Sequence, residues 1–402
     1  MSARPDLRLP PLKYLAAGIV SLVVLFHLAA VHKSDAYARH ASVDALRSRL
    51  GLSSDGMPVA SFRQDDAPAA PHRAGGADWD AHGAGNSTRA NAAFVILARN
   101  SDVWEILGSI RGIEDRFNRK YNYPYVFLND EPFNDEFKRH TSAIASGPCS
   151  YGLVPREHWE EPEWIDESKA AEERKKMADA GVIYGDSRGY RRMCRYQSGY
   201  FFRHPLLNDY DYYWRIEPSV KFYCDIDYDP FRYMADNKKK YGWTVSLYEY
   251  EKTIPTLWKT TKEFIEKHPE HLASPNMRQW LVNDKDEYNR CHFWSNFEIG
   301  DLNFFRSKAY LDYFDYLDHA GGFSMERWGD APVHSIAAAL FLKPEEIHWF
   351  HDIGYMHPPF LHCPKDSASR CACNPKDPNA FEDHWYSCTG NWKKLRPNWA
   401  SE

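Results

Sequence analysis

The chain has 402 residues and a formal net charge of -6, so its charge gives no reason to expect a nucleic-acid partner. Aromatic residues make up 15% of the chain, with 14 Trp, 25 Tyr and 22 Phe. Most rings in such an excess form hydrophobic core, but ring faces also suit the apolar faces of sugars.

An uncharged run near the start predicts a membrane anchor. Residues 14–31 contain no Asp, Glu, Lys or Arg, and as a helix they would span roughly 27 Å, close to the hydrocarbon thickness of a bilayer. Arg4, Arg8 and Lys13 favour a cytosolic tail over residues 1–13, which makes everything after the anchor lumenal. The alternative is a cleaved signal peptide, for which Ala29 and Ala30 would supply the small residues of a cleavage pattern.

Residues 32–90 form a second compositional zone. They are rich in Ala, Gly, Asp and Ser, poor in aromatic residues, and contain no cysteine. Such a segment lacks the apolar content to fold alone, so we expect a flexible stem. Asn86, Ser87 and Thr88 form an N-glycosylation sequon in this stem. Residues 91–402 then form the lumenal domain, a common size for an α/β enzyme.

A strand, a helix and a second strand are predicted at the start of this domain. The apolar run Ala92–Ala98 is typical of a buried parallel strand, and Tyr123–Leu128 is the next one. Between them, apolar residues follow helical spacing over residues 103–117, with Ser101 or Asp102 as the helix cap. Ligands in such sheets bind beyond the carboxyl ends of the strands, where Arg99-Asn100 and Asn129-Asp130-Glu131 lie.

Later segments continue the α/β pattern. We expect a charged helical tract over Glu157–Ala180, strands over Tyr210–Ile216 and Thr244–Tyr250, and helices over Phe304–Leu317 and Pro332–Phe341.

All eight cysteines fall between Cys149 and Cys388. An even number in a lumenal domain predicts disulfides, whose pairing the sequence leaves open. The alternative is a four-thiolate zinc site formed by Cys363, Cys371, Cys373 and Cys388.

Three groups of acids are candidates for binding a divalent cation. Asp209-x-Asp211 and Asp225-x-Asp227 match a short Asp-x-Asp signature, which is common in loops. Glu217 is better placed, because it follows the predicted strand Tyr210–Ile216 and Pro218 stops that strand there. The alternative for Glu217 is a surface acid paired with Arg215.

Four blocks of sequence resemble the fungal glycolipid 2-alpha-mannosyltransferases, the Golgi alpha-1,2-mannosyltransferases. The blocks are Ser187–Cys194 (SRGYRRMC), Arg215–Phe222 (RIEPSVKF), Phe293–Ile299 (FWSNFEI) and Arg327–His334 (RWGDAPVH). The resemblance covers about residues 91–390. It implies a GT-A type fold with a mixed, mostly parallel sheet flanked by helices, a GDP-mannose donor, Mn2+ as cofactor, and a mannose-terminated O-linked or N-linked glycan as acceptor. It also implies retention of the alpha configuration and a single-pass type II protein in the Golgi membrane.

The resemblance implies roles for residues in the matching segments, and the position of Arg99 at a strand end adds one more candidate. Glu217 and His357 correspond to the ligands of Mn2+. Tyr190 corresponds to a donor-binding tyrosine, and Arg99 is a further candidate for the donor at its strand end. The catalytic candidates are Glu298 and Asp330.

Alternatives remain for some of these residues. His357 could be a packed loop histidine, since His348, His351 and His362 lie in the same segment. Asp330 could bind sugar hydroxyls or cap a helix. Glu298 could attack the anomeric carbon in a double displacement, or could stabilise positive charge during front-face transfer.

Two other functions remain open on the sequence alone. One is a related retaining transferase with a different nucleotide sugar. The other is a non-catalytic paralogue that binds mannan through an aromatic surface.

Overall fold

The computed structural model describes residues 89–365 and 370–398. The predicted tail, the anchor, nearly all of the stem and the Asn86 sequon lie outside the described residues. Within the described ranges, no helix combines the length and the apolar composition needed to cross a bilayer.

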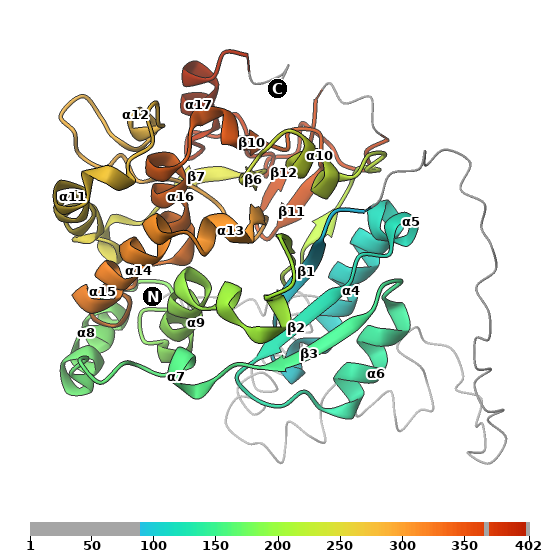
Figure 1. The fold of residues 1–402 in the computed structure, drawn as a ribbon, viewed down its shortest axis with the longest axis horizontal. Coiled ribbons are helices and arrows are strands. Elements are labelled where there is room, and N and C mark those ends of the chain that lie inside the picture. The colour runs from blue at the N-terminus through green and yellow to red at the C-terminus, as the bar shows by residue number, and fades with distance from the viewer. Residues whose placement is uncertain (1–88, 366–369, 399–402) are drawn as a thin grey trace, which may run out of the picture. The chain divides into compact units, whose positions relative to one another are not determined.

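A seven-stranded sheet organises the described part of the chain (Figure 1). In spatial order its strands are β10 (Ile347–Trp349), β6 (Tyr241–Trp243), β9 (Ile299–Asp301), β4 (Tyr212–Arg215), β1 (Ala92–Leu97), β2 (Tyr125–Asn129) and β3 (Cys149–Leu153). Strand β9 is antiparallel to both neighbours, β4 and β6, while the other pairs are parallel. The predicted mixed, mostly parallel sheet is therefore confirmed.

Two smaller sheets accompany the main one. The first contains β12 (Phe360–His362), β11 (Tyr355–His357) and β5 (Lys221–Phe222), and the second pairs β7 (Ser246–Tyr248) with β8 (Cys291–Phe293). The predicted strand over Thr244–Tyr250 thus exists as β7, outside the main sheet.

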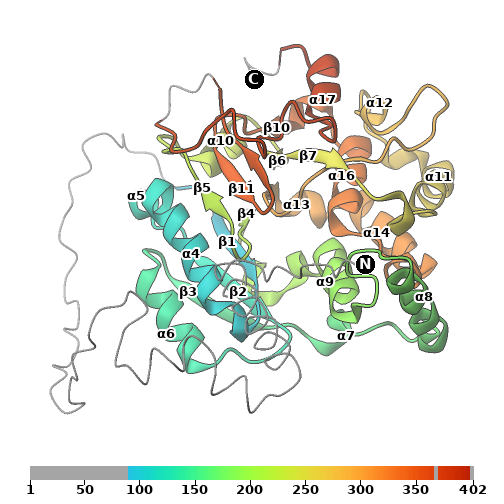
Figure 2. The same cartoon turned by 180° about the vertical axis from the view of Figure 1, so that it is seen from behind.

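The helices have the following bounds: α4 (Val103–Ile113), α5 (Arg119–Tyr121), α6 (Asp135–Ile144), α7 (Arg156–Trp159), α8 (Glu167–Asp179), α9 (Arg188–Gly199), α10 (Pro230–Asp236), α11 (Leu257–Lys267), α12 (Arg278–Leu281), α13 (Leu302–Phe305), α14 (Lys308–Ala320), α15 (Gly322–Met325), α16 (Asp330–Phe341) and α17 (Thr389–Leu395). Figures 1 and 2 show α4 and α6 on one side of β1, and α14 and α16 on the other.

The apolar run of β1 is buried on both faces of the sheet. Phe94 and Ile96 join one core cluster with residues of α4 and α10, while Ala93 and Val95 join a second with residues of α11, α14 and α16. Successive side chains of a strand point to opposite faces, so a continuous apolar run is what a sheet covered on both faces requires.

Two predicted helices are each split in two. The segment Phe304–Leu317 belongs to α13 and α14, because Ser307 interrupts it and its hydroxyl accepts a hydrogen bond from the backbone N–H of Tyr310. The charged tract Glu157–Ala180 contains α7 and α8, with Asp166 capping α8.

The domain contains three disulfides. Cys224–Cys371 and Cys291–Cys388 join residues 147 and 97 positions apart, while Cys363–Cys373 closes a local loop between residues 10 positions apart. The alternative of a four-thiolate zinc site is wrong, since all four of its cysteines are consumed in these bonds. Cys149 and Cys194 are free thiols.

A buried ion pair joins α9 to α14. The guanidinium of Arg195 donates to both carboxylate oxygens of Asp318, at 2.7 and 2.8 Å, and both side chains are almost fully buried. We expect Asp318→Ala to lower the free energy of unfolding by about 3–5 kcal/mol, because it leaves a buried guanidinium without its carboxylate. Urea unfolding at constant pH measures the loss.

Asp315→Ala is the matched control for this prediction. Asp315 lies on the same helix and pairs with Arg203 at 3.5 Å, but its side chain is exposed, so its loss should cost at most about 1 kcal/mol. Equal losses from the two substitutions would show that burial of the Arg195–Asp318 pair is unimportant.

Candidate active site

A cavity of about 480 Å³ opens at the carboxyl ends of three neighbouring strands. Its lining includes Arg99 after β1, Asn129 and Asp130 at the end of β2, and Arg215 and Glu217 at the end of β4. Parallel strands bring their carboxyl ends to one edge of the sheet, so segments far apart in sequence meet there. Helix α9 contributes the opposite wall through Tyr190, Arg192, Met193 and Gln197.

Glu217 is positioned by the end of β4 and lies between the guanidinium of Arg215 and the imidazole of His357. Arg215 donates a hydrogen bond to Oε1, and His357 Nε2 lies 3.4 Å from Oε2. Burial alone would raise the pKa of Glu217, but the charge of Arg215 and the contact with His357 lower it to about 2. Glu217 does pair with Arg215, yet it is not simply a surface acid, because it also lines the cavity.

Arg215 is a buried cation held between two carboxylates. Besides Glu217, its guanidinium donates to Asp330 Oδ2 at 2.5 Å and to the Ser295 hydroxyl at 3.3 Å. Burial opposes its charge, but the charges of Glu217 and Asp330 hold the pKa of Arg215 well above its usual value. The guanidinium therefore fixes the position of both acids.

Asp330 belongs to this network and does not cap a helix. Gly329 occupies the N-cap position of α16, and the Asp330 carboxylate accepts hydrogen bonds from Arg215 and, at 2.8 Å, from Ser295. Burial would raise the pKa of Asp330, but the charge of Arg215 lowers it. The helix-cap alternative is therefore wrong.

Glu298 lies deeper than the other acids. Its side chain is only 1% exposed, and its carboxylate accepts hydrogen bonds from Tyr213 and, at 2.6 Å, from Tyr241. His334 Nδ1 approaches the same carboxylate at 2.8 Å. Both oxygens are therefore occupied within the protein, and Glu298 does not line the cavity.

His334 connects Glu298 to the cavity wall. Its Nε2 lies 3.0 Å from the carbonyl oxygen of Gln197, which can only accept, so Nε2 is the donor of this hydrogen bond. Its Nδ1 lies 2.8 Å from Glu298 Oε2. Gln197 also lines the cavity, and this chain of bonds links Glu298 to the cavity wall.

Tyr190 and Arg99 flank the cavity from opposite walls. The ring of Tyr190 stacks on Tyr184 with centroids 4.6 Å apart, and the guanidinium of Arg327 lies 5.1 Å from its centroid. The side chain of Arg99 is largely exposed and pairs with Asp102 at 3.2 Å. Asp102, expected as a helix cap, occupies that position before α4 but makes no capping hydrogen bond with its side chain.

The other histidines near His357 in the sequence do not pair with Glu217. His362 pairs with Glu382 at 2.7 Å, and His348 is buried, which lowers its pKa to about 3. His357 instead lies on β11, beside Glu217, with the ring of Trp294 at 4.8 Å.

Glu217 and His357 fit a divalent cation. Two neighbouring ligands of an octahedral ion with bonds of about 2.1 Å lie about 3 Å apart, close to the 3.4 Å between Glu217 Oε2 and His357 Nε2.

Neither Asp-x-Asp pair lies at this cavity. Asp225 binds Arg116 at 2.5 Å and Arg370 at 2.7 Å, and the exposed Asp227 contacts Lys120. Asp209 and Asp211 precede β4, so they lie at the end of the strand opposite Glu217.

The sequence contained signals for some of the side-chain contacts in the site that we did not predict. Tyr213 and Arg215 are two residues apart on a strand and share a face. His334 follows Asp330 by four residues, which places both on one face of α16. Ser295 and Tyr241 carried no comparable signal, because their contacts depend on the packing of distant segments.

Known proteins resemble the chain over most of its length. A family model described as glycolipid 2-alpha-mannosyltransferase matches residues 68–397. The chain is 58% identical over 310 residues to glycolipid 2-alpha-mannosyltransferase 1 of Candida albicans, covering 76% of this chain and 71% of that protein. It is also 58% identical over 307 residues to alpha-1,2 mannosyltransferase KTR1 of Saccharomyces cerevisiae, covering 75% and 77%.

Solved structures agree with this relationship. Core-mannan synthase A from Aspergillus fumigatus, in its Mn/GDP form, has a TM-score of 0.73 and 42% identity over 85% of this chain and 92% of that one. The mannosyltransferase Ktr4p from S. cerevisiae in complex with GDP has the same score and identity over 76% and 82%. The chain belongs to the glycolipid 2-alpha-mannosyltransferase family.

Proposed function

We propose that this chain transfers mannose from GDP-mannose to the 2-hydroxyl of a terminal alpha-mannose on an O-linked or N-linked glycan, with retention of configuration. The observation that carries this proposal is the cavity at the carboxyl ends of β1, β2 and β4, where Glu217 lies beside His357. Relatives at 58% identity are named mannosyltransferases, and a 42% identical structure holds Mn and GDP. We also propose that the fold is of the GT-A type.

In this proposal, Glu217 and His357 hold Mn2+, and Tyr190 and Arg99 bind the donor. When bound, Mn2+ neutralises the charge of the leaving diphosphate. Tyr190 offers a phenolic hydroxyl to the diphosphate from α9, and Arg99 offers its exposed guanidinium from the end of β1.

Glu298 and Asp330 are the proposed catalytic carboxylates. A nucleophile must present a free oxygen to the anomeric carbon, whereas both oxygens of Glu298 are hydrogen-bonded inside the protein. This arrangement favours a role in which the Glu298 carboxylate stabilises positive charge on the sugar. Asp330 is held by Arg215 near the cavity wall and is suited to orienting sugar hydroxyls.

We also propose a type II arrangement in the Golgi membrane, with residues 14–31 as anchor, 32–90 as stem and 91–402 as the lumenal catalytic domain. The uncharged run and the basic residues before it support this arrangement.

Glu217→Gln tests the metal site while keeping a partner of similar shape for Arg215. Because one charged ligand is lost, Mn2+-dependent GDP binding should weaken at least about tenfold and transfer from GDP-mannose should collapse. Calorimetric titration of GDP with Mn2+, and again with a chelator, measures the metal-dependent part. His357→Ala should give the same pattern.

Asp227→Asn is the matched control, since Asp227 is an exposed acid of the rival Asp-x-Asp pair. It should bind GDP and transfer mannose as the unchanged protein does. If Glu217→Gln behaves like Asp227→Asn, the metal assignment is wrong.

Glu298→Gln removes a charge and keeps the shape of the side chain. We expect turnover to fall by roughly a hundredfold or more, because the carboxylate proposed to stabilise the developing cation is lost. GDP-mannose binding should stay within a few-fold, since the donor contacts lie elsewhere. Steady-state kinetics with methyl alpha-mannoside, together with a melting temperature, separate this effect from unfolding.

Tyr241→Phe provides the comparison, because it removes one hydrogen bond to Glu298 and leaves the carboxylate in place. The loss of turnover in Tyr241→Phe should be smaller than that in Glu298→Gln. Near-normal turnover of Glu298→Gln would leave Asp330 as the catalytic carboxylate.

The proposed topology predicts that Asn86 is glycosylated and that intact microsomes protect everything after residue 31 from added protease. Detergent should remove this protection. Digestion of the catalytic domain in sealed vesicles would falsify the arrangement.

A further inference from the structure

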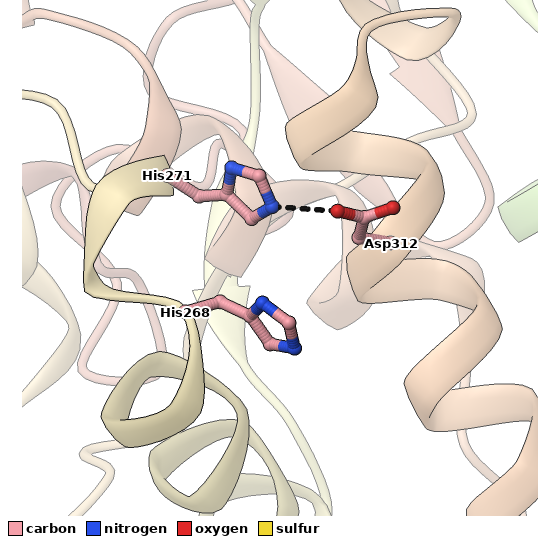
Figure 3. A group of neighbouring side chains, drawn as sticks. All are labelled: His268, His271 and Asp312. Carbon is pink, nitrogen blue, oxygen red and sulfur yellow. Dashed lines mark hydrogen bonds and ion pairs between the residues drawn. The ribbon is translucent and has the colours of Figure 1, made fainter.

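A second cluster of metal-ligand residues lies on another part of the domain. His268 and His271 flank the 3-10 turn η6 (Pro269–His271) that follows α11, and Asp312 faces them from α14 (Figure 3). One ligand atom of each residue lies within 4.8 Å of the other two. None of the three lines the cavity that contains Glu217.

The cluster offers two imidazoles and two carboxylates. His271 Nε2 lies 2.7 Å from Asp312 Oδ2. Glu270, between the two histidines in sequence, places Oε1 at 3.3 Å from His268 Nδ1 and at 3.9 Å from His271 Nε2. An ion at this point could therefore reach a fourth protein ligand.

The two histidine rings pack against each other and against Phe264. Their planes differ by 12°, with centroids 5.6 Å apart, and the buried ring of Phe264 lies 4.9 Å from His268 and 6.0 Å from His271. Such packing restricts the rotamers of both rings, which lowers the entropic cost of binding an ion. His271 is almost buried, while the other ligands are accessible from solvent.

The charges around the cluster favour a divalent cation. Glu270 and Asp312 are carboxylates, and the ammonium of Lys308 pairs with Asp312. Lys308 is exposed and lies one turn away on α14, so it can move into solvent when an ion takes the Asp312 oxygen. With neutral histidines, the four ligands carry two negative charges.

We propose that His268, His271 and Asp312, with Glu270 as a further ligand, bind Zn2+ and tie the turn after α11 to α14. Imidazole nitrogens with carboxylate oxygens are typical zinc ligands, and four of them complete a tetrahedral site. Mn2+ stands at the weak end of the affinity order for such a donor set, so this site is selective against the cation proposed for the cavity. The ion takes the place of the hydrogen bond between His271 Nε2 and Asp312 Oδ2.

The test uses the full-length chain in detergent, purified without a polyhistidine tag and saturated with Mn2+ and GDP so that the cavity is filled. Equilibrium dialysis against micromolar free Zn2+ measures the zinc bound per chain. The unchanged protein should bind one zinc more than the double variant His268→Ala/His271→Ala. The exposed His319 on α14 supplies the matched control, and His319→Ala should bind zinc as the unchanged protein does.

Two further variants keep the test decisive if the double variant unfolds. Asp312→Asn preserves size and should weaken zinc binding at least about tenfold. Lys308→Gln removes the competing ammonium and should tighten zinc binding, a result that a purely structural cluster does not predict. The proposal is overturned if the unchanged protein binds no extra zinc, or if Asp312→Asn binds it with unchanged affinity.

Discussion

The buried guanidinium of Arg215 is the interaction on which the candidate site depends. It lies at the end of β4 and holds Glu217 on one side and Asp330 on the other. These two acids belong to segments more than a hundred residues apart. Leaving the buried guanidinium without either carboxylate would be strongly destabilising. The ion network therefore couples the position of α16 to the end of the central strand.

The antiparallel strand β9 brings a third acid, Glu298, close to the site. Because β9 runs against β4, the segment that enters β9 lies beside the carboxyl end of β4, and Glu298 immediately precedes Ile299. The Glu298 carbonyl accepts a hydrogen bond from the backbone N–H of Arg215. A wholly parallel sheet would place this segment at the opposite edge, so the one reversed strand brings Glu298 within reach of the site.

Much of the fold could be predicted from local sequence, whereas the contacts of the site could not. The apolar run of β1 and the helical spacing of α4 are local patterns, and the structure contains both elements. The sequence favours Glu217 over the other acids because Glu217 ends a predicted strand and Pro218 follows it. The partners of Glu298 come from β4, β6 and α16, and the cysteine pairs join residues up to 147 positions apart. Such pairings depend on tertiary packing, which no local pattern encodes.

The charges at the cavity support the proposed role of a metal ion in binding a diphosphate there. Arg215 is already balanced by Glu217 and Asp330, and Arg192 is paired with Glu161 at 2.8 Å. Arg99 is exposed and forms an ion pair with Asp102. A diphosphate that approached this wall would meet the carboxylate of Glu217 with little uncompensated positive charge nearby. In the proposed site, a divalent cation held by Glu217 and His357 would offset that repulsion, because its positive charge would attract both the carboxylate and the diphosphate.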